Sequence, residues 1–317
     1  MNPGGPVLVL AGGVGAARFL RGLVQVVEPD DLVVVVNTGD DLRWHGLYVA
    51  PDLDTVMYWL AGLADEERGW GIRGDAFTTQ GAFTRLGMET WFQLGDQDLA
   101  THVYRTERLA AGVPLDRVTD ELAARLGVRA RLLPMSNEPV TTRLRTDRGD
   151  SHFQEYFVRD RSQPAVHEIY WTGLESARPA PGIAEAIADA RAIVIAPSNP
   201  IISIGPILRV PGMRELLAPA RGRCVAVSPL IAGRAVKGPT VELMRAQGLE
   251  ASALGVAELY RDLASAFILD AADSGLGPAI SGLGYRVATL PTLLDDRRAA
   301  QTVAVTALNL VQTKVAA

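Results

Sequence analysis

The chain has 317 residues and a formal net charge of −5, and 48% of its residues are hydrophobic while 21% are charged. This composition excludes a largely disordered chain, and the acidic balance gives no electrostatic reason to expect nucleic acid as a partner. The single cysteine, Cys224, excludes an internal disulfide and argues against a cysteine-based metal site. The sequence shows no signal peptide and no apolar stretch of membrane-spanning length, so we expect a cytoplasmic protein without a membrane partner.

The N-terminal segment predicts a strand, a glycine-rich loop and a helix. Val7–Leu10 is the strand, and Phe19–Val27 has its apolar side chains at helical spacing. Glycines in the loop between them let the backbone approach a ligand, and amides at the helix start can hold a phosphate. The loop is neither a Walker sequence nor the full dinucleotide fingerprint, and any tight strand-to-helix turn can look like it. Arg18 opposes the helix dipole, which indicates an anion to pair with.

A second buried strand, Val33–Val36, leads into an acidic region. Four carboxylates follow within fifteen residues, on two loops that a compact fold can bring together. They repel one another unless a cation or a basic group lies between them, and such hard oxygen ligands suit magnesium. Each residue alone is more simply a turn residue, a helix N-cap or a solvated neighbour, but the cluster after a buried strand favours a functional site. Its members are Asp40, Asp41, Asp52 and Asp54.

The middle of the chain predicts helices and then a β-hairpin. A Gly-Asp turn at Gly95 opens a helix that runs towards Ala111, and His102 within it is more typical of packing than of catalysis. Val140–Thr146 and His152–Val158 alternate in the manner of antiparallel strands, as a hairpin insertion or the start of a small lobe.

The C-terminal half repeats the pattern of short buried strands alternating with helices. Ser198 and Asn199, between two prolines, form a rigid polar loop after the strand Ala192–Ala196, and a loop with Arg234 and Lys237 follows the next strand. This alternation predicts a doubly wound α/β fold with a mainly parallel sheet. The loops that line one rim of the sheet then follow Leu10, Val36, Ala196 and Ser228.

Taken together and in this order, these motifs resemble the 2-phospho-L-lactate transferase family of coenzyme F-420 biosynthesis, whose members in many actinobacteria act as phosphoenolpyruvate transferases. The resemblance covers nearly the whole chain. It rests on AGGVGAARF from Ala11, NTGDD from Asn37, PDLDT from Pro51, LGDQDLATH from Leu94, HFQE from His152 and APSNP from Ala196.

The resemblance implies a Rossmann-like fold over residues 1–317, with a substrate-covering lobe at about 65–180, and a homodimer. It also implies magnesium-dependent transfer of a phosphoenolpyruvyl or 2-phospholactyl group from a guanosine diphosphate-linked donor to the deazaflavin Fo, which releases GMP. The catalytic residues and metal ligands would be Asp40 and Asp54. The acceptor would contact Asp54, Thr55, Gln93 and Asp96. The nucleotide phosphates would contact Gly12, Gly13, Val14, Gly15, Arg18, Ser198, Asn199, Pro200 and Ser203.

Two points qualify this assignment. The family commonly has arginine where this chain has Gln97, which changes how a carboxylate or the acceptor is held. An aromatic slot for the flat deazaflavin has four candidates, which are Trp44, Tyr48, Trp91 and Phe92. Two other functions stay open: a nucleotide-sugar-binding regulator of the related gluconeogenesis-factor family, and an NAD(P)-dependent oxidoreductase, against which the broken fingerprint and the clustered carboxylates argue.

Overall fold

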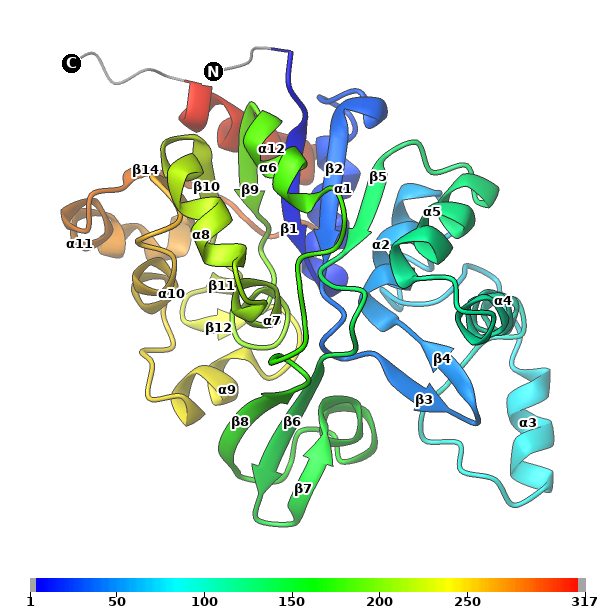
Figure 1. The fold of residues 1–317 in the computed structure, drawn as a ribbon. Helices are drawn as coiled ribbons and strands as arrows, with labels where there is room; N and C mark the ends of the chain where they lie inside the picture. The colour runs from blue at the N-terminus through cyan, green and yellow to red at the C-terminus, as the bar shows by residue number, and fades with distance from the viewer. Residues whose placement is uncertain (1–3, 313–317) are drawn as a thin grey trace.

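The computed structural model describes residues 4–312, and its centre is a seven-stranded sheet in the order β14-β13-β10-β9-β1-β2-β5. All neighbouring strands run parallel. Figure 1 shows this sheet crossing the middle of the molecule. The predicted doubly wound α/β fold is therefore confirmed. The strands are β1 (Val7–Ala11), β2 (Leu32–Val36), β5 (Arg131–Pro134), β9 (Ala192–Ile195), β10 (Cys224–Val227), β13 (Ala266–Asp270) and β14 (Arg286–Leu290).

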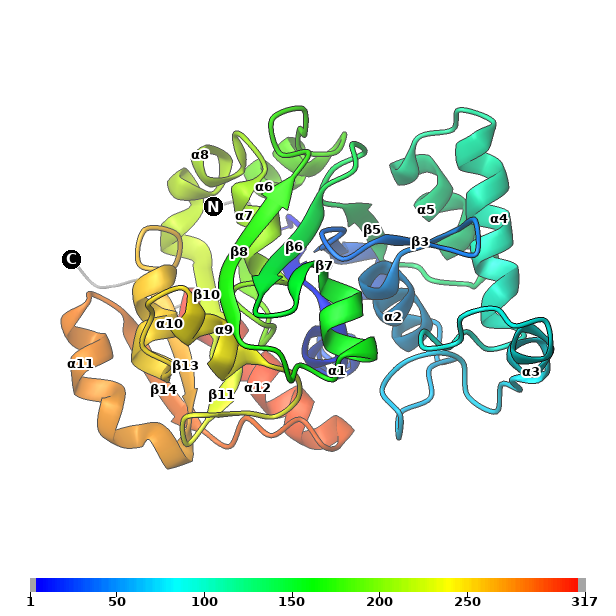
Figure 2. The same cartoon turned by 90° about the horizontal axis from the view of Figure 1, so that it is seen from below.

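Helices cover both faces of the sheet because the central strands are apolar on both sides. In β2, Val33 and Val35 pack into one core while Leu32, Val34 and Val36 pack into the other. Figure 2 shows the two helical layers on opposite sides of the sheet. One layer consists of α1 (Gly13–Leu23), α2 (Pro51–Leu60), α5 (Leu115–Arg125) and α12 (Arg297–Gln312). The other consists of α6 (Ile183–Asp189), α7 (Ile204–Arg209), α8 (Met213–Leu217), α9 (Thr240–Ala246), α10 (Ala253–Leu259) and α11 (Gly277–Gly282).

The region 65–180 is two insertions rather than one lobe, because β5 returns to the main sheet between them. The first insertion, between β2 and β5, carries a small hairpin and the helices next to it. The second, between β5 and β9, is a three-stranded antiparallel sheet in the order β7-β6-β8. The first insertion contains β3 (Leu42–Trp44), β4 (Leu47–Val49), α3 (Thr78–Arg85) and α4 (Asp98–Ala110). The second contains β6 (Thr141–Thr146), β7 (Gly149–His152) and β8 (Val166–Thr172).

The predicted strand His152–Val158 is wrong after its first residue. Strand β7 ends at His152, and Glu155–Arg159 forms a π-helical turn. Local hydrogen bonds explain the change: the backbone N–H of His152 donates to Glu155 Oε2 (2.9 Å), and the N–H of Gln154 donates to His152 Nδ1 (3.0 Å). Side chains thus satisfy backbone donors that a strand ladder would otherwise use.

Two further boundaries bear on the site. Helix α1 begins at Gly13 rather than at Phe19, so the glycine-rich loop forms its first turn. Helix α2 begins at Pro51, which favours the first helical position because it lacks an N–H. No helix within residues 4–312 combines the length and the apolar character needed to cross a membrane.

Candidate active site

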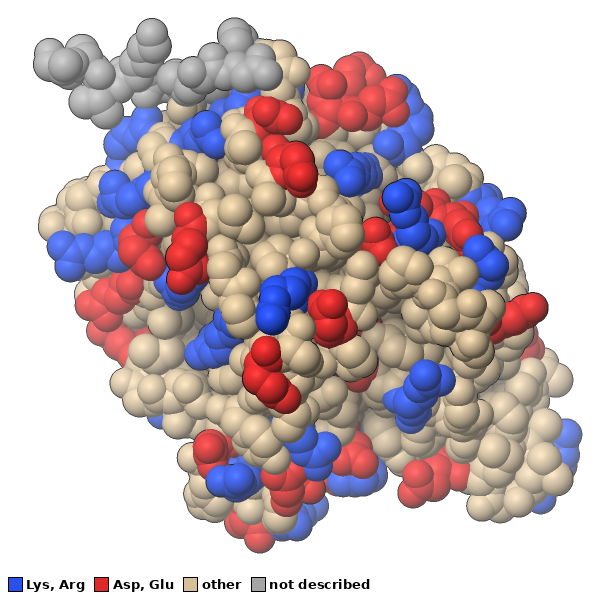
Figure 3. Space-filling view, in the orientation of Figure 1, with Lys and Arg blue, Asp and Glu red and all other residues tan. Residues whose placement is uncertain are grey.

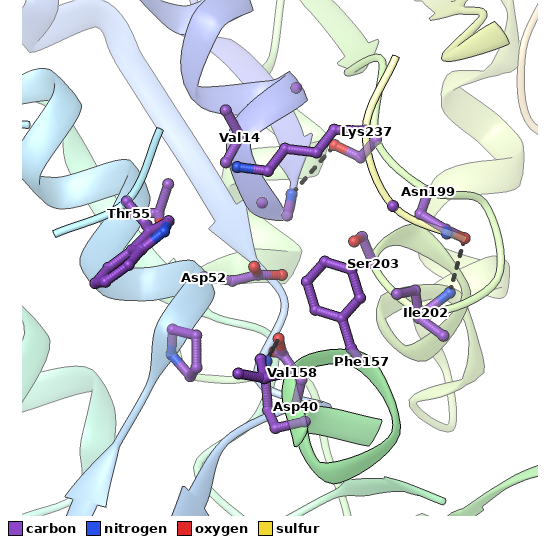
Figure 4. A pocket seen from close by; sticks show the side chains of 18 of the residues that line it. Val14, Asp40, Asp52, Thr55, Phe157, Val158, Asn199, Ile202, Ser203 and Lys237 are labelled. Atoms are coloured by element: carbon purple, nitrogen blue, oxygen red, sulfur yellow. Dashed lines mark hydrogen bonds between the residues drawn. The ribbon is translucent and has the colours of Figure 1, made fainter. Parts of the chain in front are cut away.

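A cavity of about 730 Å³ opens at the carboxyl ends of the central strands. Strand β1 lies between β2 and β9, and the chain leaves β1 in one direction and later returns to its other side. This is a topological switch point, where open α/β sheets bind ligands. The loops that follow β1, β2, β9 and β10 all contribute to the cavity, as the sequence predicted. Figure 4 shows their side chains converging on it.

The first turn of α1 forms one wall, pressed against the loop after β9. The Gly12 N–H donates to Ser198 Oγ (3.3 Å). A Cβ atom on Gly12 would lie 2.6 Å from Asp52 Oδ2, and one on Gly15 would lie 2.2 Å from the Pro197 carbonyl oxygen. Only glycine permits this packing, which places the first turn of α1 in the cavity wall.

The predicted nucleotide-binding residues divide into those that line the cavity and one that does not. Pro200 lies outside the lining. The residues that line it are Gly12, Gly13, Val14, Gly15, Arg18, Ser198, Asn199 and Ser203.

Asn37 connects two of the four carboxylates. Its Nδ2 lies 3.1 Å from Asp40 Oδ1 and 2.9 Å from Asp52 Oδ2, and both carboxylates are buried. Burial, together with the charges of Asp52 and Asp41, raises the pKa of Asp40 well above its usual range. Burial raises the pKa of Asp52 to about 6. The expectation that Asp52 lies on a loop is wrong, because it belongs to the first turn of α2.

The other two carboxylates have partners of their own. Asp41 lies outside the cavity lining and accepts a hydrogen bond from the Tyr48 hydroxyl (2.9 Å). Asp54 lines the cavity from the first turn of α2 and forms a two-pronged ion pair with Arg105 of α4. His102 Nδ1 lies 3.6 Å from Asp54 Oδ2.

Sequence reasoning missed Arg105. The signal was present as polar residues at a spacing of three and four along α4, all of them buried: Asp98, Thr101, His102 and Arg105. A helix face that is polar and also buried indicates a network rather than a solvated surface.

A magnesium ion fits this donor set. The carboxylates of Asp40 and Asp52 repel each other, and a divalent cation between them and a phosphate would relieve that repulsion. Within residues 4–312 no three Asp, Glu, His or Cys side chains form a preformed metal cage. Magnesium needs no such cage, since it usually takes one or two carboxylates and completes its shell with water and substrate phosphates.

The predicted acceptor residues are also divided. Thr55 and Gln93 line the cavity. Asp96 does not line it: its carboxylate accepts hydrogen bonds from the N–H groups of Thr78 (3.0 Å) and Thr79 (2.9 Å) at the start of α3, and these bonds lower its pKa to about 2.

Aromatic side chains supply the apolar wall. Of the four candidates, Trp91 and Phe92 line the cavity, whereas Trp44 lies behind Trp91 with its ring centroid 4.6 Å away. Tyr48 also lies outside the lining. Four lining aromatics were not predicted: Tyr58, Trp70, Phe153 and Phe157. Figure 4 shows Phe157 opposite Asp52.

Lys237 crosses the mouth of the cavity. Its Nζ donates to the Arg68 carbonyl oxygen (3.0 Å), and the side chain lies beside Val14. Burial and the nearby charge of Arg18 lower the pKa of Lys237. Arg234, the other basic residue of this loop, lies outside the lining. Lys237 and Arg18 are therefore two cations near the α1 amides.

The outer surface carries charges of both signs. In Figure 3 the basic and acidic side chains are interspersed over the visible face rather than gathered by sign.

The fold is α/β, and its cavity is lined by the glycine-rich start of α1, by an acidic cluster and by aromatic side chains. Comparison with known proteins specifies the class: the sequence model of 2-phospho-L-lactate transferase CofD matches residues 7–274, and the chain belongs to this family.

Relatives agree with this family, and a solved structure agrees with the fold. A phosphoenolpyruvate transferase of Streptomyces griseus is 43% identical over 312 residues, which is 96% of this chain and 98% of the relative. A 2-phospho-L-lactate transferase of Methanosarcina mazei is 40% identical over 290 residues, covering 92% and 95%. A crystal structure of a UPF0052-family protein from Bacillus halodurans superposes with a TM-score of 0.65 at 17% identity, covering 96% and 98%, and shows the fold alone. The chain is a transferase of this family.

Proposed function

We propose that this transferase moves a phosphoenolpyruvyl or 2-phospholactyl group from a guanosine diphosphate-linked donor to the deazaflavin Fo, in the presence of Mg²⁺. The acceptor hydroxyl oxygen bonds to the phosphorus that carries the organic group, and the bond from that phosphorus to the GMP oxygen breaks. The observation that carries the proposal is that two features line one cavity side by side, the start of α1 with Arg18 and the acidic pair Asp40 and Asp52, with Asp52 in contact with the glycine loop. A phosphate chain binds the first, and a cation joins it to the second.

The chain's residues hold the two substrates. The α1 amides, Arg18 and Lys237 face the phosphates, and Ser198 and Asn199 border the nucleotide. Asp40 and Asp54 are the proposed magnesium ligands, and Asp52, which the Asn37 amide holds beside Asp40 and next to the glycine loop, is a further carboxylate whose charge the ion would neutralise. When bound, the ion neutralises charge on the phosphates. Phosphoryl transfer needs this positioning and neutralisation more than it needs a covalent nucleophile.

The acceptor lies against the aromatic wall. Trp91, Phe92 and Phe157 offer faces to a flat ring and keep water from the reacting atoms. Asp54 accepts a hydrogen bond from the hydroxyl that attacks, and Thr55 and Gln93 border the same space.

The enolpyruvyl donor is our first choice over lactyl and glyceryl donors. The choice rests on the relatives: phosphoenolpyruvate transferases reach 43% and 44% identity over 96% of this chain, whereas two 2-phospho-L-lactate transferases are 40% identical over 92% of it. Gln97 lies outside the cavity lining, and its N–H donates to Asp75 Oδ1 (2.9 Å). Its position gives no support to a direct contact with the donor's carboxylate.

Calorimetry with GDP and with NADH, each with and without Mg²⁺, tests the binding half of the proposal. We expect GDP to bind with an affinity that Mg²⁺ increases. Tight NADH binding with indifference to GDP favours the oxidoreductase instead. GDP-sugar binding with no turnover of donor and Fo favours the regulatory protein. Light scattering of the same sample tests the homodimer that belongs to this proposal.

A further inference from the structure

A buried network backs the cavity wall behind Asp54. Helix α4 turns its polar face inward, and Arg105 on that face is only 1% exposed. The Tyr58 hydroxyl of α2 donates to Asp98 Oδ1 (2.6 Å) and lies 2.8 Å from the Thr101 hydroxyl. His102 lies between two carboxylates, with Nε2 3.2 Å from Asp98 Oδ1. The network joins α2 to α4 through side chains alone.

Arg105 holds Asp54 by both of its carboxylate oxygens. Its Nη1 donates to Asp54 Oδ2 (3.0 Å) and its Nη2 to Asp54 Oδ1. The same Nη1 lies 3.4 Å from His102 Nδ1. A planar fork of this kind fixes the orientation of a carboxylate, which the single ammonium of lysine cannot do.

Arg105 acts from a side that substrate does not reach. Asp54, Tyr58, Asp98 and His102 line the cavity, whereas Arg105 does not. An effect of Arg105 on the reaction therefore passes through the group that it holds. A residue that holds a reactive side chain from behind keeps it in the geometry that catalysis requires.

We propose that Arg105 is a positioning residue, which aims the Asp54 carboxylate at the acceptor hydroxyl. The inference rests on the proposed function, because it takes Asp54 as the acceptor's hydrogen-bond partner. A buried ion pair is often replaceable without loss of stability, so a purely structural role makes a different prediction from a positioning role.

The first test is Arg105→Lys, with Arg108→Lys as its control. Arg108 lies one turn further along α4 and makes a two-pronged pair with Glu121, away from the cavity. We expect Arg105→Lys to lower kcat by about 10²-fold, the cost of a small misplacement of reacting groups. The Kd for GDP measured in EDTA stays unchanged, because the α1 wall is untouched and no metal ligand then contributes to binding. Arg108→Lys leaves both unchanged.

A double-mutant cycle tests whether the effect passes through Asp54. Once Asp54→Asn has removed the carboxylate, adding Arg105→Lys is expected to lower kcat no further. If Arg105→Lys does not fold, the pair Asp54→Asn with Arg105→Met removes both charges, and we expect it to fold but to keep the low kcat of Asp54→Asn.

The outcomes separate the inference from the proposed function. Wild-type kcat in Arg105→Lys, or losses that multiply in the double variant, overturn the inference alone. A wild-type protein that makes no product from donor and Fo overturns the proposed function and the inference with it.

Discussion

The side-chain amide of Asn37 lies 2.9 Å from Asp52 Oδ2, and this contact ties the loop after β2 to the first turn of α2. The same amide nitrogen reaches Asp40 Oδ1 (3.1 Å) and the Ile202 carbonyl oxygen (3.2 Å). Three acceptors share two hydrogens, so Asn37 is the centre about which the acidic pair and the loop after β9 are assembled.

Asn37→Asp is expected to disrupt the site. The change replaces the donor with a third carboxylate at a position where Asn37 is fully buried, beside two carboxyl groups that burial already disfavours as anions. We expect a lower midpoint of urea unfolding without Mg²⁺ and a partial recovery when Mg²⁺ is added. Asn137→Asp, in a side chain that accepts a bond from the Asp116 N–H, is the control. Equal sensitivity of the two variants to Mg²⁺ contradicts the account.

The stability of the metal-free protein should depend on pH through Asp52. Its pKa is raised to about 6 from an ordinary value of 3.8, with burial as the first cause. The folded state therefore binds the proton more tightly than the unfolded state. The resulting stabilisation is complete below pH 3.8 and is lost as the pH rises through about 6. The difference between these two pKa values corresponds to roughly 3 kcal/mol in the free energy of unfolding.

Asp52→Asn isolates that contribution. In EDTA, the unfolding free energy of the variant minus that of the wild type is expected to rise between pH 4 and pH 7, because only the wild type loses stability there through this group. Urea unfolding at several pH values measures the difference, to which Asp40 adds in the same direction because the charge of Asp52 also raises the pKa of Asp40. A difference that is constant with pH shows that Asp52 does not titrate in this way.

Asp54→Ala is expected to destabilise the fold as well as to stop turnover. The change leaves the guanidinium of Arg105 buried without its partner, which typically costs about 3–5 kcal/mol. The sequence alone predicted that Asp54 lies on a loop, whereas the structure places it in α2, where it is buried. Asp30→Ala removes a similar ion pair with Arg129 at the surface, where such pairs contribute little. Thermal unfolding of both variants measures the two losses of stability. Equal losses would show that the buried pair of Asp54 and Arg105 stabilises the fold no more than the surface pair does.

Lys237→Met is expected to weaken GDP binding. A charge-assisted hydrogen bond contributes about 1.5–3 kcal/mol, so the Kd rises by roughly tenfold to a hundredfold. Arg234→Met removes a neighbouring exposed cation outside the cavity and leaves the Kd unchanged. Calorimetry with GDP and Mg²⁺ compares the two. A Kd that changes only in Arg234→Met contradicts the proposed role of Lys237.

The fold could largely be predicted from the sequence because the patterns of its central strands allow few other structures. Runs such as Val33–Val36 are β-branched, short and apolar on both faces, a pattern that leaves few alternatives. Strand β5 was missed because Arg131–Pro134 has only two central apolar residues and ends in proline. It is a strand because it pairs with β2 at the edge of the sheet, which is tertiary information.

The parts of the candidate site that follow strand ends could be predicted from the sequence, whereas the parts that depend on tertiary packing could not. The glycine loop and Asp40 follow strand ends, so their neighbourhood is predictable. Arg105 and Lys237 come from a helix and a loop distant in sequence, and only the folded structure shows that Arg105 contacts the Asp54 carboxylate and Lys237 the Arg68 carbonyl oxygen. Asp96 precedes α4 in the sequence, but its carboxylate accepts hydrogen bonds from the first amides of α3, a tertiary contact that the sequence does not indicate.

The central claim is tested most directly by turnover. The purified protein is given Fo with each of the enolpyruvyl, lactyl and glyceryl guanosine-linked donors, in Mg²⁺ or in EDTA, and the products are identified by mass spectrometry. We predict GMP together with a dehydro deazaflavin product, lighter than the lactyl one, that forms in Mg²⁺ and not in EDTA. Exclusive use of another donor corrects the choice of donor alone. The absence of GMP and of any substituted deazaflavin with all three donors in Mg²⁺ would contradict the account.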